Sequence, residues 1–119
     1  MGLPSDLAQQ LQNPYFAPLQ GVGAQGRAEN AACGDELTIE VEAQEGRFQV
    51  RYQVRGCAAL VAGSSLWVAH VDQIEAAQAE ALDPKALFDA AGGLPARSQH
   101  VARVIERAWR QALAGLAKR

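Results

Sequence analysis

Hydrophobic and polar residues alternate strictly over residues 36–42 and again over residues 47–54. A period of two is typical of a β-strand that buries one face and exposes the other. The segment between them, residues 43–46, ends in glycine, as hairpin loops commonly do. The pattern therefore predicts two antiparallel strands joined by a hairpin, with Glu42 opposite Arg47.

Two longer segments have the hydrophobic pattern of helices. Residues 58–71 are apolar nearly all round, which predicts a helix buried in the centre of the molecule. Residues 98–117 place apolar side chains three and four positions apart, which predicts a helix with one buried face. Shorter helices are expected at 5–12 and at 84–91, the latter after the cap Asp83 and Pro84, with a weaker helical pattern at 72–82.

The rest of the N-terminal half is rich in Gly, Pro and Gln from residue 14 to residue 30, which indicates a loop with a short edge strand near 26–29. The predicted fold is therefore α+β, a small antiparallel sheet of two to three strands with helices packed on one face. A chain of 119 residues suits a single domain spanning 1–119.

Composition narrows the function classes. Hydrophobic residues make up 49% of the chain, so a packed core is expected. Thirteen acidic against eleven basic residues give a formal charge of −2, which offers no electrostatic reason to bind nucleic acid or an anionic membrane. No secretory signal or membrane-spanning stretch is visible, so a cytoplasmic location is expected.

The two cysteines are the main candidate functional residues. Cys33 precedes the first predicted strand and Cys57 follows the second, so the hairpin should bring both sulfurs to one edge of the sheet. Asp35 lies two residues from Cys33, and His100 lies near the start of the last helix. Sulfur, carboxylate and imidazole donors together suit zinc. Cys57 at a helix N-terminus should also have a lowered pKa, which favours the thiolate.

Other interpretations of the same residues stay open. The cysteines could be buried small hydrophobic residues, Asp35 a turn residue that accepts from backbone amides, and His100 an exposed residue of a first helical turn. His70 is given no functional role. Two tryptophans within apolar helical patterns are expected in the core: Trp67 and Trp109. The arginines on the outer side of the last helix are expected to be exposed to solvent: Arg103, Arg107 and Arg110.

These motifs resemble a known family. The order Ala32-Cys33-Gly34-Asp35, then Gly56-Cys57 entering a helix with Ser64-Ser65-Leu66, then Leu94-Pro95 leading to His100, is similar to the U-type iron–sulfur scaffolds IscU, SufU and the N-terminal part of NifU. The resemblance covers roughly residues 13–115. It implies a small α+β protein that assembles clusters on three cysteines with the help of an aspartate, some members binding zinc there. Cys33, Asp35 and Cys57 match the first cysteine, the aspartate and the second cysteine.

The sequence departs from the family pattern at the third cysteine. Aligned to IscU members, Val101 stands at that position, and aligned to SufU members, His100 does. The resemblance implies that the missing thiol would accept persulfide sulfur from a cysteine desulfurase. The Pro-Val-Lys segment that resembles the Hsp70-type chaperone site of IscU members is also missing, which counts against docking of that chaperone.

The resulting prediction is a non-enzymatic scaffold-like protein that binds either an iron–sulfur cluster or zinc. Among clusters, the 2Fe–2S type is expected first. Its expected metal ligands are Cys33, Asp35, Cys57 and His100. The expected partners are a cysteine desulfurase or related sulfur donor and iron–sulfur acceptor proteins. One alternative is a zinc-binding regulator of a sulfur-transfer system. Another is a thiol-redox or sulfur-transfer protein in which Cys57 accepts sulfur and Cys33 resolves it.

Overall fold

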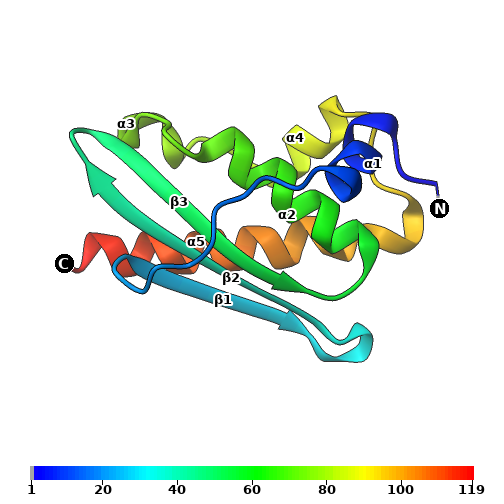
Figure 1. The fold of residues 1–119 in the computed structure, drawn as a ribbon, viewed down its shortest axis with the longest axis horizontal. Coiled ribbons are helices and arrows are strands. Elements are labelled where there is room, and N and C mark those ends of the chain that lie inside the picture. Colours follow the sequence, from blue (N-terminus) through cyan, green and yellow to red (C-terminus); the bar gives the residue numbers. More distant parts are fainter. Residues whose placement is uncertain (1) are drawn as a thin grey trace.

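A three-stranded antiparallel sheet in the order β1-β2-β3, with helices on one face, forms the fold in the computed structural model, which describes residues 2–119 (Figure 1). The elements in chain order are α1 (Ser5–Gln12), β1 (Ala24–Asn30), the 3-10 helix η1 (Ala31–Cys33), β2 (Asp35–Gln44), β3 (Arg47–Arg55), α2 (Ala58–Val71), α3 (Ala76–Ala79), α4 (Pro84–Ala90), the 3-10 helix η2 (Ala96–Ser98) and α5 (His100–Ala117). The α+β prediction with two to three strands is confirmed.

The hairpin between β2 and β3 forms as predicted, but the predicted register was wrong by two residues. Gln44 pairs with Arg47, and Glu42 pairs with Gln49 instead of Arg47. The turn is only two residues long, and both Glu45 (φ 54°) and Gly46 (φ 79°) have the positive φ that tight hairpin turns require. A shift of two positions leaves every side chain on its predicted face, because the side-chain period is also two.

The edge strand β1 is longer than the strand expected at 26–29, because it pairs with β2 from Ala24 to Asn30. Its close approach to α5 depends on Gly26, where a Cβ atom would lie 1.9 Å from the carbonyl oxygen of Ala108. Glycine therefore lets the strand backbone lie directly against the helix backbone.

The core lies between the sheet and the helices. Helix α5 runs behind β1 and β2, and α2 covers β3 (Figure 1). Trp67 of α2 and Trp109 of α5 are fully buried and meet edge to face, with ring centroids 5.5 Å apart. This confirms the prediction that both tryptophans belong to the core.

The extended segment 13–23 crosses from α1 to β1 and is held against the sheet by polar side chains. Its backbone reaches the outer edge of β3, where Tyr52 donates its N–H to Ala17 at 2.8 Å. Farther along, the fully buried Glu40 accepts hydrogen bonds from the backbone N–H groups of residues 20–23. The Tyr52 contact satisfies a backbone donor on the otherwise open edge of β3, and the Glu40 contacts hold the end of the segment.

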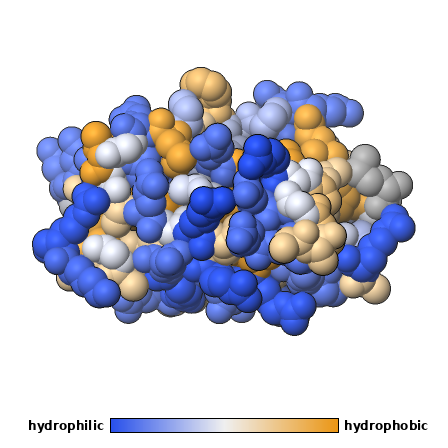
Figure 2. All heavy atoms as spheres, turned by 90° about the horizontal axis from the view of Figure 1, so that it is seen from below, coloured by the Kyte–Doolittle hydropathy of each residue, from blue (hydrophilic) through white to orange (hydrophobic). Residues whose placement is uncertain are grey.

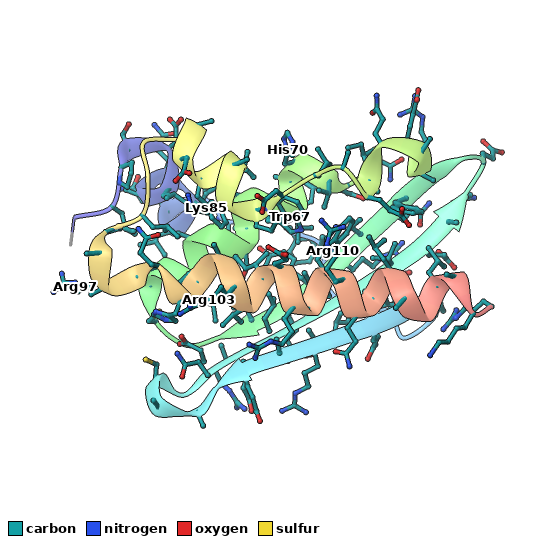
Figure 3. All side chains as sticks on the ribbon, turned by 180° about the vertical axis from the view of Figure 1, so that it is seen from behind. Trp67, His70, Lys85, Arg97, Arg103 and Arg110 are labelled. Carbon is teal, nitrogen blue, oxygen red and sulfur yellow. The ribbon has the colours of Figure 1, made fainter. Side chains whose placement is uncertain are left out.

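The surface is largely polar. Viewed from the side of β1, it is mostly hydrophilic, with small separate hydrophobic areas (Figure 2). On the helical side, Arg103 and Arg107 of α5 are exposed as expected. Arg110 is a correction, because it is half-buried and donates to the carbonyl oxygens of Glu80 and Leu82 between α3 and α4 (Figure 3). Among the described helices, none is long and apolar enough to cross a membrane.

Candidate metal centre

Asp35 lies at the middle of the candidate site. It is the first residue of β2 and its side chain is fully buried. Gly34, in the left-handed region at φ 67°, ends η1 and turns the chain between Cys33 and the strand. The turn leaves Cys33 exposed on one side of the carboxylate and directs Asp35 inward. A fully buried carboxylate requires partners, and two other chain segments supply them.

The second cysteine is the first of these partners. Cys57 caps the start of α2, and its backbone N–H donates to Asp35 Oδ1 at 2.8 Å. Its Sγ atom lies 3.6 Å from Asp35 Oδ2. The preceding Gly56 makes this approach sterically feasible. It has φ 149°, and a Cβ atom there would lie 2.2 Å from Asp35 Oδ1.

His100 approaches the same carboxylate from the first turn of α5, with Nε2 3.2 Å from Asp35 Oδ2. One ligand atom each from Cys33, Asp35 and His100 lie within 4.8 Å of one another. Sulfur, oxygen and nitrogen donors in this arrangement are a donor set that zinc and iron accept. Asn30 supports the exposed thiol, since its Nδ2 lies 3.8 Å from Cys33 Sγ.

All four residues expected at the site are brought to one end of the sheet. Cys33, Cys57 and His100 line one hollow of about 240 Å³, and the Asp35 carboxylate contacts Cys57 and His100. The hairpin argument for the two cysteines was therefore sound, although the register used for it was not. Asp35 also fulfils the simpler interpretation, because it accepts a backbone N–H from Cys57.

The structure also separates the two candidates for the missing third cysteine position. His100 lies in the site, whereas Val101 is fully buried in the core. A Cβ atom on Gly63 of α2 would come within 3.1 Å of Val101 Cγ1. Of the two neighbours, His100 is the residue whose side chain reaches the Asp35 carboxylate.

The predicted lowering of the Cys57 pKa was wrong. Burial of the thiol raises its pKa, and the nearby Asp35 carboxylate raises it further. The backbone amides of Leu60 and Ala59 at the start of α2 act in the opposite direction, but they do not overcome these effects. The helix N-terminus alone therefore does not make this thiol acidic, which removes support for the thiol-redox alternative.

Sequence reasoning did not identify the other walls of the hollow, which are formed by Leu3, Ala59, Arg97 and Ser98. Arg97 and Ser98 lie three and two residues before His100, so proximity in sequence could have indicated them. Leu3 carries no such signal, because only tertiary packing brings the N-terminus to this end of the sheet.

Fold and site together define a small α+β protein that presents sulfur, carboxylate and imidazole donors at one end of an antiparallel sheet. Residues 8–119 match the family model of the NifU-like N-terminal domain, and the chain belongs to this family. The resemblance found in the sequence is confirmed.

Two curated relatives come from Archaeoglobus fulgidus and are named iron–sulfur cluster assembly scaffold proteins IscU 1 and IscU 2. Each is 32% identical to this chain over 94 residues, which cover 78% of this chain and 60% of the relative. The chain thus spans less than two thirds of the length of these relatives.

Solved structures share the fold at lower sequence identity. The N-terminal part of a nitrogen-fixing NifU-like protein from Brucella abortus gives a TM-score of 0.72 at 13% identity, covering 97% of this chain and 94% of that one. A candidate iron–sulfur cluster assembly scaffold for the SUF system from Fervidobacterium islandicum gives 0.62 at 13% identity, covering 94% of both chains. At this identity the likeness establishes the fold alone.

Proposed function

We propose that this chain is a non-enzymatic scaffold that carries an iron–sulfur cluster or a zinc ion on Cys33, Asp35, Cys57 and His100. The observation that carries the proposal is the convergence of Cys33, Asp35 and His100 within 4.8 Å, in a chain of the NifU-like family. The function named for the Archaeoglobus fulgidus relatives supports the same assignment.

The four donors would have different roles in metal binding, according to their exposure to solvent. Cys33 is exposed and can meet incoming iron or sulfide first. Asp35 is held by the Cys57 backbone N–H and lies beside His100, so its carboxylate is oriented before metal arrives. Two thiolates, one imidazole and one carboxylate complete four positions, so no third cysteine is needed for a mononuclear site.

The proposal extends to partners and domain organisation. A cysteine desulfurase or related enzyme would supply sulfur, and iron–sulfur proteins would accept the finished cluster. The family match over residues 8–119 supports treating 1–119 as one domain.

Zinc is the second candidate cargo, and a specific observation favours it. The closest group of donors contains only one sulfur, with Cys57 joined to it through Asp35. A single ion surrounded by mixed sulfur, oxygen and nitrogen donors is a common zinc arrangement. The protein would then regulate a sulfur-transfer partner while retaining the same four ligands.

Anaerobic purification followed by iron, sulfide and zinc analysis tests the proposal. We expect reconstitution with ferrous iron and sulfide to give a visible chromophore that Cys33→Ala and Cys57→Ala abolish and His100→Ala weakens. Zinc without sulfide, retained in a one-to-one ratio, would select the zinc function. Failure of folded wild-type protein to hold either cargo contradicts the proposal.

A matched pair of cysteine variants tests the assignment of the third position. His100→Cys places a third thiol beside Asp35, so its reconstituted cluster should lose its chromophore more slowly in air than the wild-type cluster. Val101→Cys places the thiol in the core and should resemble wild type. A stabilising effect of Val101→Cys alone would show that α5 rotates in the loaded protein and that His100 is not the ligand.

A further inference from the structure

The N-terminal arm, residues 2–4, lies at the same end of the molecule as the thiols. Leu3 lines the hollow together with Cys33, Cys57 and His100. It offers no ligand atom, and its side chain packs partly buried against the hydrophobic core. Leu3 thus forms an apolar wall of the candidate site, although it is 30 residues or more from every proposed ligand.

Two contacts fix the arm in this place. The carbonyl oxygen of Pro4 accepts the N–H of Ala8 at 2.9 Å, which ties the arm to the first turn of α1. On its other side the arm packs against the connection that leads to α5. A Cβ atom on Gly92 would lie 2.8 Å from Pro4 Cβ, and one on Gly2 would lie 3.7 Å from Pro95 Cγ. The bare Cα of Gly92 therefore leaves the room that Pro4 occupies.

The two thiols differ in how much this wall can affect them. Cys33 is exposed, whereas Cys57 is only partly exposed and lies deeper in the hollow beside Asp35. An apolar side chain in the wall of the hollow restricts water and reagents mainly at the deeper group. Leu3 is a wall residue whose truncation removes no proposed ligand and no hydrogen bond of Asp35.

We propose that Leu3 is a shielding residue of this site, which limits the access of water, thiol reagents and chelators to Cys57. Slow exchange of the bound metal would follow from this shielding, and that second statement rests on the proposed function. The shielding itself requires no metal and can be measured in the metal-free protein.

Alkylation of metal-free protein by iodoacetamide, followed at each cysteine by mass spectrometry, tests the shielding. In Leu3→Ala we expect Cys57 to react about tenfold faster and Cys33 to change by less than about twofold, since loss of a partly buried leucine is worth about a tenfold change in an opening equilibrium. Leu11→Ala is the control, because Leu11 is also partly buried against the core but does not line the hollow. An unchanged Cys57 rate in folded Leu3→Ala, or an equal acceleration in Leu11→Ala, overturns the proposal.

A second variant perturbs the arm through the connection that packs against Pro4. Gly92→Ala should displace Pro4 and accelerate Cys57 in the same way, while leaving every residue that lines the hollow unchanged. Leu3→Met should keep the wild-type rate. If Leu3→Ala does not fold, as judged by circular dichroism, Gly92→Ala and Leu3→Met decide the question. A Gly92→Ala rate equal to wild type then contradicts the proposal.

Release of zinc from loaded protein to a coloured chelator separates this inference from the proposed function. Faster release from Leu3→Ala than from Leu11→Ala supports both. Faster alkylation of Cys57 in a protein that binds neither zinc nor a cluster supports the shielding and refutes the metal function. Unchanged alkylation in a protein that binds metal tightly refutes the shielding alone.

Discussion

At the scale of single residues, the site depends on the fixed orientation of Asp35. Its two carboxylate oxygens contact Cys57 and His100, which come from different helices. Gly56 permits these contacts because any larger residue would collide with Asp35 Oδ1. A residue without a side chain is therefore required for the geometry of the candidate site.

The variant Gly56→Ala should displace the Asp35 carboxylate and strain a backbone at φ 149°. We expect a loss of stability of about 2–4 kcal/mol and zinc affinity at least about tenfold weaker. Urea unfolding and competition with a zinc chelator measure the two effects.

Gly46→Ala is the control for backbone strain, because Gly46 also has positive φ but nothing within 4 Å of its missing Cβ. It should lose about 1 kcal/mol of stability and keep its zinc affinity. Equal zinc affinity in Gly56→Ala and Gly46→Ala would disprove the role assigned to Gly56.

At the scale of elements, β2 organises two regions of the molecule through its buried carboxylates. Asp35 at its start gathers the candidate ligands, and Glu40 near its middle holds the segment that leads into β1. Burial of Glu40 opposes its ionisation. Four backbone N–H donors outweigh the burial, and they lower the pKa of Glu40 below its ordinary value of 4.5. The strand thus positions a long irregular segment with one side chain.

Replacing Glu40 by Gln should destabilise the fold by about 2–3 kcal/mol near neutral pH, because an amide N–H₂ would then face backbone donors. A lowered folded-state pKa means that the carboxylate stabilises the fold above pH 4.5 and that this contribution is lost as pH falls through the folded pKa. Urea midpoints measured from pH 7 downward should therefore fall more steeply for wild type than for Glu40→Gln.

Glu42→Gln on the same strand is the matched control. Glu42 is half-buried, and its nearest cationic atom, Arg51 Nη1, is 3.8 Å away. Its replacement should change stability by less than about 1 kcal/mol. Parallel pH profiles for wild type and Glu40→Gln would contradict the role assigned to the Glu40 carboxylate.

At the scale of the whole molecule, the sheet and α5 form one packed unit. β1 lies so close to α5 that Gly26 faces the backbone of Ala108 and Ala112 without a side chain between them. Helix α5 also provides a hydrogen-bond acceptor for β1, because the backbone N–H of Arg27 donates to Gln111 Oε1 at 2.7 Å. Helix α5 also begins with His100. The way α5 docks on the sheet therefore sets both its packing against β1 and the position of the histidine.

Gly26→Ala should separate β1 from α5 and cost about 3 kcal/mol or more, since a Cβ would meet backbone atoms that cannot move aside. The free energy of unfolding in urea measures the loss. Gln25→Ala, an exposed neighbour on the same strand, should stay within about 0.5 kcal/mol of wild type. Similar values for the two variants would contradict the close packing of β1 on α5.

Much of this molecule could be predicted from its sequence, for identifiable reasons. The alternation in 36–42 and 47–54 is a local pattern, so the hairpin and the faces of its strands were recognised. The same alternation cannot distinguish registers two residues apart. The turn at Glu45 and Gly46 made that choice through its backbone conformation.

The sequence by itself determined the α+β class and the central helix at Ala58–Val71, and it indicated the four candidate donors, because chain order and periodicity carry that information. Tertiary structure alone decided that His100 faces the site and Val101 the core, that burial raises the Cys57 pKa, and that Leu3 lines the hollow. Each of these depends on contacts and burial created by segments far apart in the chain. Such contacts follow from how the helices dock on the sheet, which local patterns do not specify.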